Sequence, residues 1–172
     1  MKSITAFILL LSAAMLPAAT LNIQYEVSTV NAPTNEYKYT YFLSGDALPA
    51  NHYFDILFPI STYTSISNGI ATDWDLLLFQ VSDPTGSDGR YSALSLPPST
   101  FAGPFSVQFI WAGGGNGPGS QPFELYNDSS VLQLSGTTTL RQTTEPPSGI
   151  PEPSTVVILA SGLALLSTLK KR

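Results

Sequence analysis

Between residues 20 and 144, hydrophobic and polar positions alternate along short segments, which is the pattern of a β-strand with one buried face. Residues 36–44 place Tyr37, Tyr39 and Tyr41 on one face. Residues 52–59 alternate in the same way, and so do residues 105–111. We expect these side chains to face the core: Phe54, Ile56 and Phe58 in the first of these segments, and Phe105, Val107, Phe109 and Trp111 in the second.

Residues 74–79 are apolar on both faces of the expected strand, with Trp74, Leu76 and Leu78 against Leu77 and Phe79, which predicts a central strand. Weaker strand candidates cover residues 21–29, 89–96, 121–126 and 131–140. Turn signals fall at residues 44–46, 68–69, 83–86, 97–99, 113–119 and 126–128. About eight short strands at this spacing predict an all-β fold, an antiparallel β-sandwich that is Ig-like or jelly-roll-like. The strand order cannot be predicted from this pattern.

The first nineteen residues have a different pattern. Lys2 precedes an uncharged apolar run over residues 4–16, and Pro17, Ala18 and Ala19 follow. A run of this length is short for a membrane span and suits the hydrophobic region of a signal peptide. We therefore predict a signal helix over residues 1–19, cleaved between Ala19 and Thr20, with residue 14 as a second possible site. A buried helix or an anchor is the alternative.

Residues 155–169 form a second uncharged, apolar stretch, which a basic cluster of Lys170, Lys171 and Arg172 follows. We predict a transmembrane helix with a basic tail over residues 155–172. The positive-inside rule then places the tail in the cytoplasm and the remainder of the chain outside. The segment before it, residues 145–154, is rich in proline, which disfavours regular helix and predicts an extended stalk.

The order Pro151, Glu152, Pro153, hydrophobic helix and basic cluster resembles the PEP-CTERM sorting signal of Gram-negative bacteria. This resemblance covers residues 150–172. It implies recognition by exosortase, a membrane enzyme that would remove the helix and tail. It also implies transient anchoring in the inner membrane and delivery to the cell surface or the extracellular polysaccharide matrix. A plain C-terminal anchor with a proline-rich linker is the alternative.

Composition narrows the functional classes for the 172-residue chain. It contains no Cys, which excludes disulfides and thiolate chemistry, and its length favours one domain. The net charge is −5, but residues 20–153 hold only three basic residues against twelve acidic ones, a formal charge of −9. Such an acidic body disfavours nucleic-acid binding, because few cations are present to neutralise phosphates.

Candidate chemistry in the expected domain is sparse. His52 is the one histidine, and no nucleophile motif accompanies it. Asp73 and Asp75 fall on one side of a strand and could form a carboxylate pair, although acids that flank a core Trp are more often solvated. The segment from Asp83 to Asp88 is rich in oxygen ligands and could bind calcium, but it lacks an EF-hand pattern. The glycine-rich residues 113–119 predict a hairpin loop between two strands.

The tyrosine row Tyr37, Tyr39 and Tyr41 is the remaining candidate, since exposed rings of this kind can stack on sugars, whereas buried rings would simply form the core.

We predict a non-enzymatic, exported β-sandwich protein with a structural or adhesive role and no catalytic residue, cofactor or metal. Its expected partners are signal peptidase, the general secretion machinery and exosortase. A carbohydrate-binding module that contacts exopolysaccharide is the first alternative, and a secreted hydrolase is the second.

Overall fold

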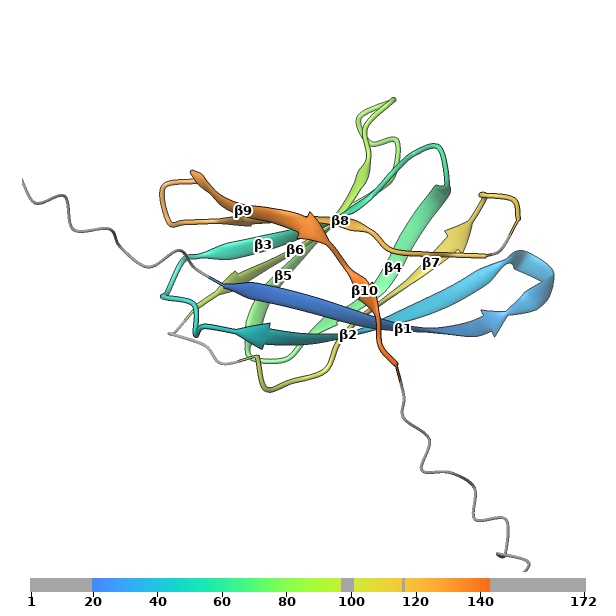
Figure 1. The fold of residues 1–172 in the computed structure, drawn as a ribbon. Coiled ribbons are helices and arrows are strands. Elements are labelled where there is room, and N and C mark those ends of the chain that lie inside the picture. Colours follow the sequence, from blue (N-terminus) through green and yellow to red (C-terminus); the bar gives the residue numbers. More distant parts are fainter. Residues whose placement is uncertain (1–19, 97–100, 116, 143–172) are drawn as a thin grey trace, which may run out of the picture. The chain divides into compact units, whose positions relative to one another are not determined.

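The computed structural model describes residues 20–96, 101–115 and 117–142, which fold into two five-stranded β-sheets (Figure 1). The first sheet has the strand order β10-β1-β2-β7-β4, and the second has the order β5-β6-β3-β8-β9. The elements are β1 (Leu21–Asn31), the 3-10 turn η1 (Ala32–Thr34), β2 (Glu36–Gly45), β3 (Tyr53–Phe58), β4 (Tyr63–Ala71), β5 (Trp74–Phe79), β6 (Gly89–Ser95), β7 (Phe105–Trp111), β8 (Pro122–Tyr126), β9 (Leu132–Thr137) and β10 (Thr139–Leu140).

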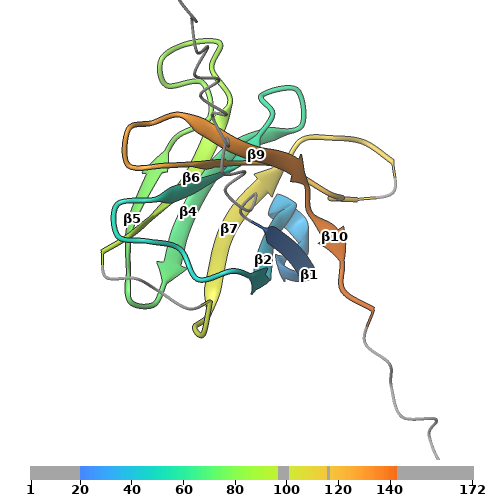
Figure 2. The same ribbon diagram turned by 60° about the vertical axis from the view of Figure 1, so that its left-hand side comes forward.

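The predicted β-sandwich is confirmed, because the inner faces of both sheets contribute to one buried hydrophobic cluster. The expected alternation holds in β3 and β7, whose inward residues Phe54, Ile56, Phe105 and Val107 are fully buried. One pairing departs from the antiparallel expectation. The chain leaves the second sheet after β9, and the short β10 then pairs in parallel with β1 (Figure 2).

The prediction that residues 74–79 form a central strand is wrong, because β5 lies at the edge of the second sheet beside β6. Its inward residue Trp74 is buried, as expected for a core position. Its outward residues Leu77 and Phe79 are instead 57% and 46% exposed. Apolar residues on both faces of this strand therefore mark an exposed apolar surface rather than a second buried face.

The turn predicted at Asn68 and Gly69 is also wrong, because both residues lie within β4. The register between β4 and β7 shifts between Ser67 and Ile70, so this dipeptide forms an irregularity inside a strand. Asn68 adopts a left-handed conformation, with φ of 47°. Asparagine tolerates this conformation, which explains why the sequence resembles a turn.

The glycine-rich residues 113–119 do not close a hairpin as predicted. They connect β7 in the first sheet to β8 in the second sheet, so the segment carries the chain across the end of the sandwich. The Tyr39 hydroxyl donates a hydrogen bond of 2.7 Å to the carbonyl of Gly119.

A buried polar cluster lies where the chain leaves the second sheet for the first, between β9 and β10. The backbone N–H of Gln121 donates to Thr138 Oγ1 at 2.9 Å, and this hydroxyl donates to Gln121 Oε1 at 3.1 Å. Gln121 Nε2 also donates to the hydroxyl of Tyr63 at 3.3 Å and to the carbonyl of Gly119. Both Gln121 and Thr138 are buried, and the side chain of each has its partners within the protein.

The predicted signal peptide, stalk, sorting motif and C-terminal helix with its basic tail all lie outside the described residues. Among the residues that the structure describes, no helix is long and apolar enough to cross a membrane.

Candidate functional site

The outer face of the second sheet carries a row of polar side chains that the strand register fixes. Asp55 in the central strand β3 lies opposite Ser92 of β6 on one side and opposite Glu124 of β8 on the other. Ser92 in turn lies opposite Leu77 of the edge strand β5. Because Ser92 is short and stands between longer side chains, the row has a low point over β6.

A hollow of about 290 Å³ occupies this low point. Its size is close to the lower end of the range for small-molecule sites, roughly 300 Å³. Strands β5, β6 and β3 provide most of the wall, and the turn between β8 and β9 adds one residue. The lining residues are Tyr53, Asp55, Asp75, Leu77, Phe79, Arg90, Ser92, Leu94 and Ser130.

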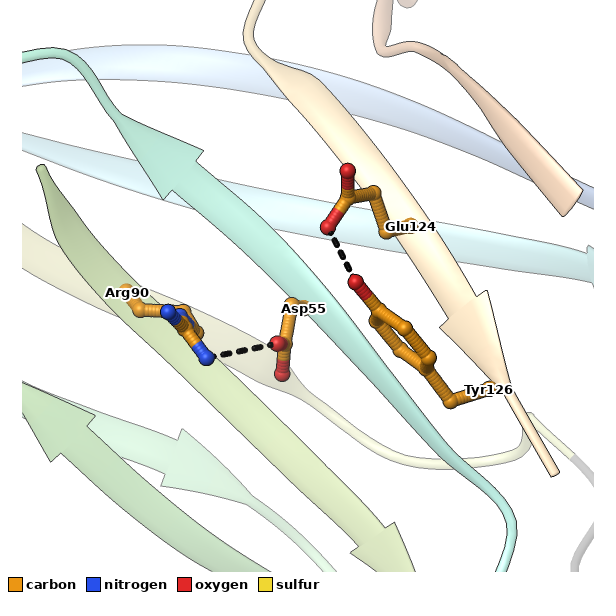
Figure 3. Close-up of polar contacts among 4 residues, drawn as sticks. All are labelled: Asp55, Arg90, Glu124 and Tyr126. Atoms are coloured by element: carbon orange, nitrogen blue, oxygen red, sulfur yellow. Dashed lines mark hydrogen bonds and ion pairs between the residues drawn. The ribbon is translucent and has the colours of Figure 1, made fainter. Parts of the chain in front are cut away.

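Asp55 is the unusual residue of this hollow. Its side chain is only 2% exposed, and its Oδ2 forms an ion pair with Arg90 Nη1 at 3.3 Å (Figure 3). Burial raises the pKa of the Asp55 carboxyl, and the nearby Glu124 charge adds to this effect. The nearby Ser92 hydroxyl and the Arg90 charge act in the opposite direction. The net effect is a carboxylate whose charged form is disfavoured by its surroundings.

The second oxygen of Asp55, Oδ1, has no hydrogen-bond partner among the described residues. A buried carboxylate oxygen without a donor is costly, so it calls for a physical explanation. The other buried side-chain atoms in the described part of the chain that lack a partner are neutral and do not line the hollow. They are Tyr41 Oη, Ser106 Oγ and Trp111 Nε1. Asp55 therefore combines an ion-paired carboxylate, one oxygen of which lacks a partner, with a position at an open hollow.

Glu124 and Tyr126 flank Asp55 on the side opposite Arg90 (Figure 3). The Tyr126 hydroxyl donates a hydrogen bond of 2.6 Å to Glu124 Oε2. This bond to the carboxylate raises the pKa of Tyr126 to about 12. The ring of Tyr126 stacks on Tyr53, with centroids 4.9 Å apart. These contacts hold a pair of aromatic rings beside the carboxylates on the same face.

The opposite wall is apolar. Phe79 and Leu77 project from β5, and the Arg90 guanidinium lies 5.5 Å from the centre of the Phe79 ring. Arg90 is thus shared between a carboxylate and an aromatic ring, an arrangement that fixes a long side chain in place. The hollow combines rings, aliphatic side chains, carboxylates and one guanidinium.

The structure places two tyrosines of the predicted row, Tyr39 and Tyr41, inside the sandwich, so the three rings do not form an exposed row. Tyr39 and Tyr41 are buried, and Tyr37 is half-buried and stacks on Phe109. Burial raises the pKa of both Tyr39 and Tyr41. The even spacing of the row correctly indicated a shared face, but that face is the core.

The other predicted candidates are separated in space or have structural partners. Asp75 lines the hollow, whereas Asp73 lies in the turn before β5 and is not part of the lining. Asp88 Oδ1 accepts a hydrogen bond from the backbone N–H of Ile60. His52 Nδ1 lies 3.5 Å from the carbonyl oxygen of Ala50. Within the described ranges, no group of three or more acidic or histidine side chains could hold a metal ion.

One feature of the sequence could have indicated this site. Asp55 is a charged residue in the middle of an otherwise apolar strand, a position that needs an explanation. No such feature marks the residues around Asp55, because their proximity depends on the strand pairing. These residues are Ser92, Arg90, Glu124 and Tyr126.

The comparisons with known proteins assign no family. No protein-family model and no curated protein matches the chain. Among solved structures, the chain is similar to a cohesin module from a family 33 glycoside hydrolase of Clostridium perfringens. The identity is 10% and the TM-score is 0.39, with 73% of this chain and 99% of the module covered. A likeness this distant assigns no function to the β-sandwich.

Proposed function

We propose that the chain is an exported, non-enzymatic adhesive protein of the cell surface or extracellular matrix, whose β-sandwich binds a saccharide. The observation that carries the binding proposal is the hollow on the outer face of the second sheet. There Asp55, Asp75 and Arg90 line the same surface as aromatic and aliphatic side chains.

A saccharide fits this combination of groups better than a purely apolar or a purely charged ligand. Sugar rings present C–H faces that pack against aromatic side chains such as Phe79 and Tyr53. Their hydroxyls donate to carboxylates and accept from guanidinium groups, which Asp75 and Arg90 supply here. The −9 charge of residues 20–153 opposes an anionic ligand.

Binding of glycans to the full chain on an array tests this function. We expect Phe79→Ala to weaken binding about tenfold, because the variant loses apolar contact area at the hollow. Ile110→Ala is the matched control, since Ile110 is an exposed apolar residue on β7 of the other sheet. Absence of binding to any glycan, or equal losses in both variants, would contradict the proposal.

Export and sorting rest on the sequence signals at residues 1–19 and 150–172. Mass spectrometry of the mature protein from its native host tests both processing events. We expect a start at residue 20 and loss of the C-terminal helix and tail. Replacing Pro151 and Glu152 by Ala should then prevent C-terminal processing, whereas unchanged processing would contradict recognition by exosortase.

Glycoside hydrolysis is a second candidate, and the raised pKa of Asp55 beside Glu124 is the observation that favours it. A pair of carboxyl groups, one of them with a raised pKa, is usual for this reaction. Burial of Asp55 argues against this reaction, because a side chain that is 2% exposed has little access to a glycosidic bond. Release of reducing ends that disappears in Asp55→Asn would favour hydrolysis.

A further inference from the structure

The hollow has a charge imbalance that goes beyond a general affinity for saccharides. Its lining holds two carboxylates, Asp55 and Asp75, against the single cation Arg90. Glu124 lies directly across from Asp55 on the neighbouring strand and adds a third negative charge to the same face. A neutral ligand would leave this excess of negative charge without compensation.

Arg90 does not provide the missing compensation. Its guanidinium contacts only one oxygen of Asp55, and it also lies over the ring of Phe79. The ion pairs of the described residues are Arg90 with Asp55 and Arg141 with Glu26, so Asp75 has no cationic partner in the described part of the chain. An exposed carboxylate without a cationic partner and a buried carboxylate oxygen without a hydrogen-bond partner therefore belong to residues that line one hollow.

The position of Asp55 increases the effect of these charges. Water and salt screen a buried carboxylate less than an exposed one, so its field acts more strongly on a ligand in the hollow. A protonated amine offers three N–H donors and a positive charge within one small group. Hydrogen bonds between such a group and a carboxylate are stronger than those of a neutral hydroxyl.

We propose that the hollow selects saccharides that carry a free, protonated amino group, so that a hexosamine residue is preferred to its N-acetylated or neutral counterpart. This inference rests on the proposed saccharide site and names the ligand class for that site. The amine would contact Asp75 directly and compensate the negative charge of Asp55, while the sugar ring packs against Phe79 and Tyr53.

The test is calorimetric titration of the full chain with glucosamine oligomers and with fully N-acetylated oligomers of the same length, at low salt and at a pH that keeps the amine protonated. We expect the glucosamine oligomers to bind about tenfold more tightly, as a charge-assisted hydrogen bond would provide. Asp75→Asn should remove most of this preference, because it weakens binding of the glucosamine oligomers more than binding of the N-acetylated oligomers. Glu36→Gln is the matched control, because it removes one carboxylate from β2 of the other sheet.

The outcomes separate this inference from the function on which it rests. No binding of either oligomer, together with no binding on the glycan array, overturns the proposed function. Binding of both oligomers with equal affinity, or tighter binding of the N-acetylated one, overturns the amine preference alone. A preference that survives in both Asp75→Asn and Asp55→Asn, or that Glu36→Gln reduces equally, overturns the assignment to this hollow.

Discussion

Two buried polar groups of this protein have opposite surroundings. At the end of the sandwich, Gln121 and Thr138 satisfy one another and bond to Tyr63 and Gly119. On the outer face of the second sheet, Asp55 is equally buried, yet its Oδ1 has no partner and burial raises its pKa. The first group is neutral and fully bonded, whereas the second is charged and incompletely bonded.

This difference indicates two different roles. A satisfied buried network stabilises the fold and fixes where the chain changes sheets. An incompletely paired buried charge lowers stability, and such groups concentrate where binding or chemistry needs them. Mutations should therefore separate the two groups. Changes at the end of the sandwich should lower stability without affecting the hollow, and changes around Asp55 should affect both.

The largest effect is expected for Thr138→Val. The variant keeps the side-chain shape but leaves the Gln121 N–H and Oε1 buried without their partner, at a cost of about 2–4 kcal/mol in the free energy of unfolding. Urea denaturation measures this loss. Thr139→Val, at the exposed next residue, should change the free energy by less than about 0.5 kcal/mol. Similar losses in both variants would contradict a structural role for the network.

Arg90→Met should have the next largest effect, because it leaves Asp55 buried without its cation. We expect the free energy of unfolding to fall by about 1–2 kcal/mol near neutral pH. The fall is limited because the Arg90 side chain is 49% exposed, so solvent weakens the ion pair. The loss should disappear when Asp55→Asn is combined with it. Arg141→Met is the matched control, since both partners of its ion pair with Glu26 are about 40% exposed. A loss that persists in the double variant would show that Arg90 acts through packing.

Asp55→Asn should have a smaller effect, an increase in the free energy of unfolding. The size of this increase should depend on pH. Burial raises the pKa of Asp55 above its unfolded value of about 3.9, so the folded protein binds this proton more readily than the unfolded chain. Wild-type stability therefore decreases relative to the variant as pH rises through this window. Urea denaturation from about pH 4 to pH 7 should show a growing advantage of Asp55→Asn. A difference in stability that stays constant with pH would contradict the cost assigned to burial of the charged Asp55 carboxylate.

The sequence predicted the core of the fold well because burial repeats locally. In β3 and β7 the period of two alone identifies the inward residues, such as Phe54 and Val107. The same signal could not distinguish an edge strand from a central one, so β5 was placed wrongly. Neighbouring strands decide that question, and here only β6 pairs with β5 in its sheet.

The candidate site was missed for a related reason. A row of tyrosines is conspicuous in the sequence, but Tyr39 and Tyr41 fill the space between the sheets. The hollow instead assembles residues from β3, β5 and β6 whose positions depend on cross-strand register. Pairing of this kind has no local sequence signal, since it follows from the strand order that the pattern left undetermined.

Tyr126→Phe should have the smallest effect and tests whether burial, rather than bond length, determines the cost of losing a hydrogen bond. The Tyr126–Glu124 bond of 2.6 Å is shorter than either bond that the Thr138 hydroxyl forms with Gln121. Glu124 is only half-buried, so water can replace the lost hydroxyl, and the ring retains its stacking on Tyr53. We expect urea denaturation to show a loss of about 0.5 kcal/mol, with no change in Tyr53→Phe. A loss as large as that of Thr138→Val would mean that Glu124 depends on this bond as strongly as Gln121 depends on Thr138, and the contrast between the two groups would then fail.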